Sequence, residues 1–213
     1  FFSLLLCGWL LNAAVHAEEP VMLDFAGPTM GTRYSVKVFD PPKFKEDIRF
    51  EVDALLRRIN DQMSTYLKGS EISRFNQSES TEWFEVSADL AVVVGAAQEV
   101  SKASGGAFDV TVGPLVNAWS FGPDPRSRTV PADDKLESLL NSVGYEKLAV
   151  RTDPPALRKS VSTLNVDLSA IAKGYAVDRV VKLLNDAGAE DVFVEIGGEV
   201  RTSGNKDGTW WKV

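Results

Sequence analysis

The chain has 213 residues, 44% of them hydrophobic, which suffices for one sizeable packed domain or two small ones and excludes global disorder. Its formal net charge of −7 argues against a nucleic-acid-binding surface, so no nucleic-acid partner is expected. An acidic protein of this kind binds an anionic ligand only through a local basic group or a metal ion.

Residues 1–17 are typical of a signal peptide. An apolar run is followed by small residues and by Val15-His16-Ala17, which approximates an A-x-A cleavage site. A membrane anchor is one alternative and lipidation of Cys7 another, although Cys7 lies inside the apolar run. Cleavage would remove the single Cys and the single His, which leaves no disulfide, Cys or His metal site or Ser-His-Asp triad in residues 18–213. We expect secretion across the inner membrane to the periplasm.

The first half of the remaining chain predicts two strands followed mainly by helices. The strands are expected at residues 21–25 and 32–39, joined by a turn-rich link. Apolar residues recur every three to four positions from Ile48 to Met63, which predicts a long helix over residues 43–66. The next elements are a short helix from Ser70, a strand at 83–86, and a helix that Ser87 caps and that ends at Ser104.

The second half mixes strands and helices without strict alternation. An extended run is expected at 107–112, followed by a loop with Pro123, Pro125 and Pro131 and a helix at 133–143. Three strands are expected next, at 147–151, 156–161 and 165–168. The last elements are a helix that Ser169 caps and that runs to about residue 187, and a strand at 192–196. This order favours an α+β or irregular α/β fold over a doubly wound dinucleotide fold, because no G-x-G-x-x-G motif follows the first strand. Residues 208–213 resemble the start of a strand and the first residue is not Met, so we expect further sequence beyond both ends.

Residues 165–178 place a carboxylate, a helix start and a lysine close together. Asp167 ends an apolar run, Ser169 is positioned to cap the following helix, and Lys173 lies about one turn inside that helix. A phosphate at such a helix start would meet backbone N–H groups, the helix dipole and an ammonium group together. The carboxylate could hold the metal ion that such a phosphate carries. The simpler alternative is a capped helix with an exposed lysine.

Several motifs occur in the order found in one known family. They are Met30-Gly31-Thr32, Ser64-Thr65-Tyr66, Ser70 through Asn76, Gly105 through Leu115, Asp167 through Gly174, and Ile196-Gly197-Gly198-Glu199. Each motif alone is weak, but together they cover nearly all of residues 18–213. The chain therefore resembles the ApbE family of FAD:protein FMN transferases.

The resemblance implies a flavin transferase domain at residues 18–213 with an α+β fold, in which helices flank a mixed, largely antiparallel sheet that is truncated at the C-terminus. It also implies a magnesium-dependent enzyme that splits FAD, attaches the FMN half to a Thr or Ser hydroxyl of a partner protein, and releases AMP. The acceptor protein would supply the nucleophile. The membrane would be contacted only through the signal peptide or a lipid anchor.

The matching positions of the family imply roles for individual residues. The implied flavin-nucleotide contacts are Met30, Tyr66, Ala107, Phe108, Asp109, Asp167 and Lys173. Ala170 would offer its backbone carbonyl to Mg²⁺, whereas the metal carboxylate of the family and a nearby Thr would lie beyond Val213. Lys173 is the candidate for charge stabilisation during phosphoryl transfer, and Asp167 the candidate for holding the ligand or orienting the metal.

Each of these assignments has an alternative. Tyr66 could be a core residue at a helix end, and Met30 could simply fill the core. Asp109 could belong to an Asx turn, Phe108 is expected in the core more than at the ligand, and Gly197-Gly198 could form a hairpin turn. At the level of function, the same site could hydrolyse FAD with water as the acceptor, or a periplasmic flavin-binding protein could hold the flavin without turnover.

Overall fold

The computed structural model describes residues 21–123 and 129–213, and within these ranges it confirms the predicted α+β fold. The predicted signal peptide, Cys7, His16 and Pro125 lie outside the described residues. The strands form a four-stranded and a three-stranded sheet, and neighbouring strands in both sheets are antiparallel. A search of the described ranges finds no helix with the length and apolar composition that a membrane crossing requires.

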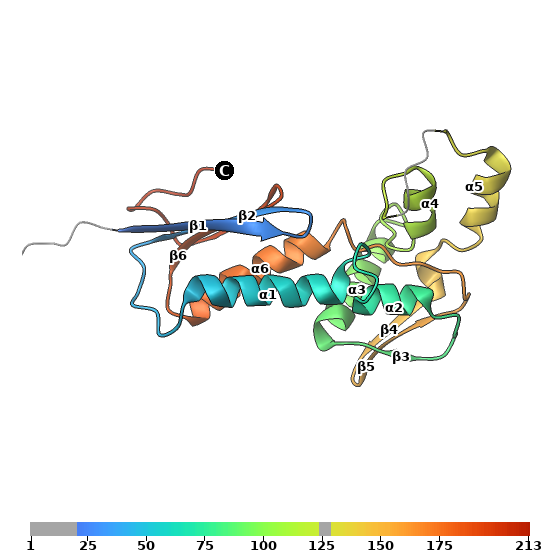
Figure 1. Ribbon diagram of the computed structural model, residues 1–213, viewed down its shortest axis with the longest axis horizontal. Helices are drawn as coiled ribbons and strands as arrows, with labels where there is room; N and C mark the ends of the chain where they lie inside the picture. Colours follow the sequence, from blue (N-terminus) through green and yellow to red (C-terminus); the bar gives the residue numbers. More distant parts are fainter. Residues whose placement is uncertain (1–20, 124–128) are drawn as a thin grey trace, which may run out of the picture.

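The larger sheet is a layer with helices on one face (Figure 1). Its strand order is β1–β2–β6–β7, built from β1 (Met22–Thr29), β2 (Thr32–Phe39), β6 (Asp191–Ile196) and β7 (Glu199–Ser203). The covering helices are α1 (Ile48–Met63) and α6 (Ala172–Asp186). Because α6 contacts β6 and β7 as well as α1, the start of α6 is held close to the β6–β7 hairpin.

The smaller sheet and the remaining helices form the other end of the molecule (Figure 1). The smaller sheet has the order β3–β5–β4. The elements are α2 (Glu71–Gln77), β3 (Phe84–Glu85), α3 (Ala88–Ala103), α4 (Gly113–Ala118), α5 (Asp133–Leu140), the 3₁₀ turn η1 (Tyr145–Lys147), β4 (Leu148–Thr152) and β5 (Pro155–Lys159). The long helix α1 contacts α2 and α3 as well as β1 and α6, so it connects the two ends.

A continuous apolar core underlies this arrangement. Alternate residues of β2 and β6 are buried, because successive side chains of a strand point to opposite faces of the sheet. Helix α1 contributes Val52, Leu55 and Ile59, spaced three to four residues apart as the sequence predicted. Full burial of a side chain of this size stabilises a fold by about 1.5–3 kcal/mol.

Side-chain caps define the helix starts. Ser70 and Ser87 each accept a hydrogen bond from the backbone N–H three residues further on, which confirms the predicted cap at Ser87 and the helix start at Ser70. Helix α1 begins later than predicted because the carboxylate of Asp47 caps it. It also ends earlier, at Met63, which leaves Tyr66 in the following loop.

Three predicted extended segments are wrong. Residues 107–111 form bends and a turn, residues 165–168 contribute only Asn165 to a parallel bridge with Val112, and residues 208–213 form no strand. The sequence pattern also does not predict α4 or β7. Helix α4 has only six residues, and β7 has no buried residue, so its extended form depends on pairing with β6.

Candidate active site

Two tight hairpin turns lie against each other at one end of the larger sheet. The β1–β2 turn consists of Met30 and Gly31, with φ of 48° and 73°, and the β6–β7 turn of Gly197 and Gly198, with φ of 56° and 100°. A Cβ atom on Gly197 would approach Cγ2 of Thr32 to 2.7 Å, so glycine is needed for this close approach. The hairpin alternative for Gly197-Gly198 is therefore confirmed.

Lys173 is the second residue of α6 and lies beside the β6–β7 turn. Its Nζ donates to both carboxylate oxygens of Glu199, at 2.9 Å each, and to the carbonyl of Gly197 at 3.5 Å. The side chains of Lys173 and Glu199 are 30% and 40% exposed, so this ion pair is accessible to solvent and to ligands.

The start of α6 differs from the predicted serine cap. Ile171 occupies the N-cap position, without a capping side chain. The backbone N–H of Ser169 instead donates to the carboxylate of Asp167 at 2.8 Å. The predicted Ser169 cap is therefore wrong, because Asp167 closes residues 167–169 into an Asx turn that ends before the helix begins.

Tyr66 lines two cavities and is 62% exposed. The first cavity, of about 560 Å³, is lined largely by apolar groups and includes Met30 and Lys173. The second, of about 490 Å³, is lined largely by polar groups and includes Asp167. The Tyr66 hydroxyl donates to the carbonyl of Phe121 at 3.1 Å. The core alternative for Tyr66 is therefore wrong, and its ring is available to a ligand from either cavity.

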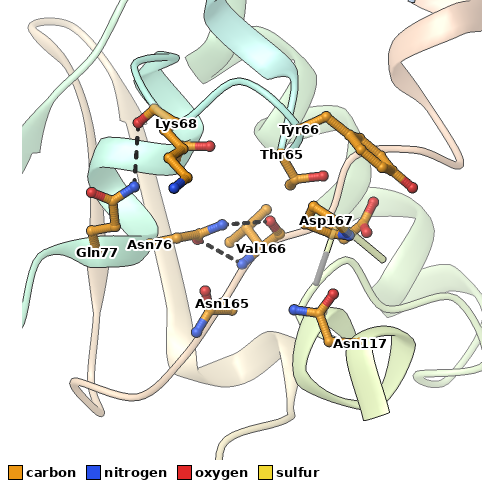
Figure 2. Close-up of a pocket in the computed structure, with 12 residues that line it drawn as sticks. Thr65, Tyr66, Lys68, Asn76, Gln77, Asn117, Asn165, Val166 and Asp167 are labelled. Carbon is orange, nitrogen blue, oxygen red and sulfur yellow. Dashed lines mark hydrogen bonds between the residues drawn. The ribbon is translucent and has the colours of Figure 1, made fainter. Parts of the chain in front are cut away.

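Thr65 and Asn117 belong to the lining of the polar cavity, and the buried oxygens Thr65 Oγ1 and Asn117 Oδ1 behind it make no hydrogen bond in the part of the chain described. Figure 2 shows Tyr66 and Asp167 close together at one side of this cavity, with Asn76 further along the wall. Because most of its lining is polar, this cavity is suited to a polar ligand.

The segment that carries Asp167 is fixed by its backbone. The side-chain amide of Asn76 donates to the carbonyl of Val166 at 2.9 Å and accepts from the N–H of Val166 at 2.8 Å (Figure 2). The N–H of Asp167 donates to the carbonyl of Val110 at 2.7 Å. These contacts place the Asp167 carboxylate at the cavity independently of any side-chain ion pair.

Residues 107–109 line neither of the two cavities, although the next residue, Val110, accepts the hydrogen bond from Asp167. One carboxylate oxygen of Asp109 accepts from the N–H and the hydroxyl of Thr111, at 2.8 and 2.7 Å, so the Asx-turn alternative is confirmed. Phe108 packs against the core and Ala107 is exposed. The structure thus groups Met30, Tyr66 and Lys173 around one cavity, and Tyr66 and Asp167 around the other.

A metal ion would find few protein ligands here. Across residues 21–123 and 129–213 there is no cluster of three or more His, Cys, Asp or Glu side chains able to hold one. Ala170 is exposed in the turn before α6, and its carbonyl accepts no hydrogen bond from the described residues. A free carbonyl and the nearby Asp167 carboxylate are hard oxygen donors, and Mg²⁺ usually takes its other ligands from water and phosphate. These donors fit an ion that a diphosphate brings with it.

Comparison with known proteins identifies the family. Residues 30–213 match the family model described as the ApbE family. The chain belongs to the ApbE family. A relative from Vibrio cholerae named FAD:protein FMN transferase is 45% identical over 214 residues, covering 96% of this chain and 64% of the relative. A relative of the same name from Haemophilus influenzae is 40% identical, covering 95% of this chain and 61% of the relative.

Solved ApbE structures share the fold. The flavin transferase ApbE from Vibrio cholerae superposes with a TM-score of 0.87 at 44% identity, covering 92% of this chain and 63% of that one. The flavinyl transferase ApbE of Pseudomonas stutzeri in its apo form gives a TM-score of 0.83 at 34% identity, covering 91% and 64%. The chain spans about three fifths of the length of the curated ApbE relatives it matches.

Three polar residues of this ApbE-family chain have no predicted role but support the site. Asn76 and Glu199 lie inside motifs that carry the resemblance, whereas no sequence signal marks Lys159. Lys159 is fully buried, and its ammonium donates to the carbonyls of Phe75, Asn76 and Leu164 at 3.2, 3.2 and 3.3 Å. Burial disfavours the charged form and lowers the pKa of Lys159 from its ordinary value.

Proposed function

We propose that this protein binds FAD beside Tyr66 and transfers its FMN half, in a Mg²⁺-dependent reaction, to a Thr or Ser hydroxyl of a partner protein, with release of AMP. The observation that carries the proposal is the position of Tyr66, which lines both the cavity of Lys173 and the cavity of Asp167. A planar ring can stack on Tyr66 while a phosphate approaches the lysine. The names of the relatives, FAD:protein FMN transferase, support this reaction.

The proposed step is a phosphoryl transfer. The hydroxyl oxygen of the acceptor attacks the phosphorus of the FMN half and releases its proton to water, and a new P–O bond forms. The P–O bond of the diphosphate breaks, and its electron pair leaves on the phosphate of AMP. Charge develops on the phosphate oxygens, so catalysis depends mainly on positioning and on nearby positive charge.

This chain supplies groups for both tasks. Lys173 offers an ammonium at the start of α6, where the helix dipole also favours an anion. Asp167 and the carbonyl of Ala170 are the donors that would hold Mg²⁺, which neutralises phosphate charge when bound. Met30 and Tyr66 offer apolar and aromatic contacts to the flavin nucleotide, and residues 107–109 are proposed to contact it from beside the polar cavity.

The proposal includes a location. A signal peptide at residues 1–17 would export the protein to the periplasm, where it would meet its acceptor protein. A lipid or membrane anchor at the same segment is the alternative. Mass spectrometry of the protein recovered from a periplasmic extract tests this, since cleavage after Ala17 leaves Glu18 as the first residue.

One assay separates the proposed transferase from its alternatives. The intact protein is incubated with FAD, Mg²⁺ and a candidate acceptor domain, and the denatured products are examined for flavin fluorescence in the gel. A fluorescent acceptor band with one AMP released per label supports the transferase. AMP release without a labelled band indicates hydrolysis, and unchanged FAD after prolonged incubation indicates a flavin-binding protein.

The role of Lys173 is tested by Lys173→Met. We expect acceptor labelling to fall by about 10²-fold, because charge at the diphosphate is lost while the methylene packing is kept. The control is Lys182→Met, which breaks an exposed ion pair on the same helix and should leave labelling unchanged. A loss of thermal stability with unchanged labelling would make Lys173 a structural residue.

A further inference from the structure

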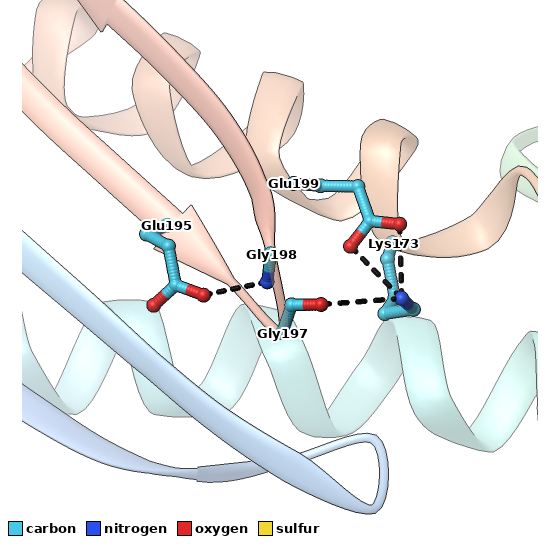
Figure 3. Close-up of polar contacts among 5 residues, drawn as sticks. All are labelled: Lys173, Glu195, Gly197, Gly198 and Glu199. Carbon is cyan, nitrogen blue, oxygen red and sulfur yellow. Dashed lines mark hydrogen bonds and ion pairs between the residues drawn. The ribbon is translucent and has the colours of Figure 1, made fainter. Parts of the chain in front are cut away.

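The ammonium of Lys173 is engaged by acceptors from its own chain. Figure 3 shows its Nζ between the carboxylate of Glu199 and the carbonyl of Gly197. Both carboxylate oxygens lie 2.9 Å from Nζ and the carbonyl oxygen 3.5 Å away. The two oxygens belong to one carboxylate and meet the ammonium from the same side, so Glu199 is its main partner and the more distant Gly197 carbonyl a weaker one. A phosphate that approaches Lys173 therefore competes with the Glu199 carboxylate for the same ammonium group.

The acceptor most easily displaced is the Glu199 carboxylate. Gly197 is held in the backbone of the β6–β7 turn, where its N–H donates to the carbonyl of Arg33. Glu199 instead reaches Lys173 with a flexible side chain that is 40% exposed. Exposed ion pairs contribute little net stability because water screens them, so another anion can replace the carboxylate.

The Glu199 carboxylate is also not needed to hold the surrounding structure. The β6–β7 turn is fixed by Glu195, whose carboxylate accepts from the N–H of Gly198 at 2.6 Å (Figure 3). Helix α6 and strand β7 have a second ion pair between Asp178 and Arg201. Breaking the ion pair between Glu199 and Lys173 therefore leaves the β6–β7 turn and the contact between α6 and β7 in place.

We propose that Glu199 is a competing anion: it occupies the ammonium of Lys173 in the free protein and must be displaced when a diphosphate binds there. Its two oxygens take the hydrogen-bond positions that two phosphate oxygens would take. Binding at Lys173 is thus an exchange of one anion for another, and Glu199 lowers the affinity of the site for every diphosphate ligand. The inference rests on the proposed binding of the FAD diphosphate by Lys173.

The test measures equilibrium binding of FAD to the intact protein by quenching of flavin fluorescence, with and without Mg²⁺. Glu199→Gln keeps the size of the side chain but removes the charge, so we expect FAD to bind roughly three- to fivefold more tightly, the scale of one exposed ion pair. Glu199→Ala should act in the same direction. The matched control is Asp178→Asn, which removes the other α6–β7 ion pair and should leave FAD affinity unchanged.

A double-mutant cycle tests whether Glu199 changes FAD affinity through Lys173. Lys173→Met and Lys173→Met/Glu199→Gln should have the same FAD affinity, because without the ammonium there is no competition. A gain that persists in the Lys173→Met background would overturn the inference, since Glu199 would then repel the ligand directly.

The remaining outcomes separate this inference from the proposed function. If Lys173→Met weakens FAD binding while Glu199→Gln leaves it unchanged or weaker, the competition is wrong and the binding role of Lys173 stands. If the wild-type protein binds no FAD, or Lys173→Met binds it unchanged, the proposed role of Lys173 fails, and the competition fails with it. Thermal melting by circular dichroism checks that each variant is folded.

Discussion

The segment that carries Asp167 and the helix start that carries Lys173 are held in different ways. Before Asp167, Val166 is bound at both its N–H and its carbonyl by Asn76, and Leu164 is bound by the buried Lys159. Lys173 is anchored by its helix, but its charged end is held by an exposed ion pair with Glu199. The Asp167 carboxylate is thus placed by buried and partly buried hydrogen bonds to the backbone before it, whereas the Lys173 ammonium is placed by a contact that a ligand can replace.

This difference suits the two proposed tasks. A group that orients a metal or ligand must stay in one position. Buried hydrogen bonds hold it there, because losing one of them costs a large amount of free energy. A group that meets the charge of an incoming diphosphate must be able to change partners. Substitutions in the buried network should therefore cost stability first, and substitutions at the ion pair should change ligand affinity first.

The largest expected effect is at Lys159. Lys159→Met removes the ammonium that serves three backbone carbonyls, and we expect the free energy of unfolding to fall by about 3 kcal/mol, because buried acceptors lose their donor. Urea unfolding measures this. The control is Lys182→Met at an exposed ion pair, expected within about 0.5 kcal/mol of wild type. Equal stabilities of the two variants would show that the buried network does not hold the Asp167 segment.

The next effect is at Asn76. Asn76→Ala removes both hydrogen bonds to Val166, which should lower the free energy of unfolding by about 2 kcal/mol. Hydrogen exchange at the amide of Val166 should become faster, because its acceptor is gone. Gln77→Ala is the matched control, since Gln77 donates to the carbonyl of Lys68 at an exposed site. Unchanged protection at Val166 in Asn76→Ala would contradict the role given to this amide.

Helix α6 has a partly buried anchor of its own, and it is sensitive to alkali. Burial, followed by the hydrogen bond to Asp89, raises the pKa of Tyr175 to about 12 from an ordinary value of 10. Below pH 10 the Tyr175 hydroxyl keeps its proton in both the folded and the unfolded chain, so its full contribution to the free energy of unfolding is present. Between pH 10 and 12 the Tyr175 hydroxyl loses its proton in the unfolded chain but keeps it in the folded chain. The free energy of unfolding therefore falls as the pH rises.

The size of this alkaline effect is at most about 1.4 kcal/mol per pH unit for one group. Comparing urea unfolding at pH 9 and pH 11, wild type should lose about 1 kcal/mol more than Tyr175→Phe. Tyr34, whose pKa is likewise raised to about 12, contributes the same loss to both proteins and cancels in the comparison. An identical pH dependence of the two proteins would remove Tyr175 as the source.

The smallest expected effect on stability is at the ion pair itself. Glu199→Gln should change the free energy of unfolding by less than about 1 kcal/mol, because the pair is partly exposed. Its thermal midpoint should therefore lie close to that of Asp178→Asn. A loss as large as that of Asn76→Ala would show that the Lys173–Glu199 pair is structural, and the contrast between the two segments would disappear.

The helix starts and the buried face of α1 are features that sequence reasoning predicts correctly. Ser70 and Ser87 mark helix starts because a cap acts on the N–H group three residues away. The apolar spacing of α1 identifies its buried face for the same local reason. The Ser169 cap failed because the N–H groups of Ile171 and Ala172, from which it would accept, donate to the carbonyl of Leu168 instead. A pattern of residue types does not predict this backbone acceptor.

The amino-acid sequence by itself determined the family, the α+β class, the helix start at Ser70, the helix cap of Ser87, and the placement of Asp167 and Lys173 around a helix start. Only the tertiary structure decided that Tyr66 lines two cavities, that Asn76 binds Val166 90 residues away, and that Lys173 pairs with Glu199 26 residues away. The reason is range: caps and periodicity act between neighbours in the chain, whereas these contacts depend on how the sheets and helices pack.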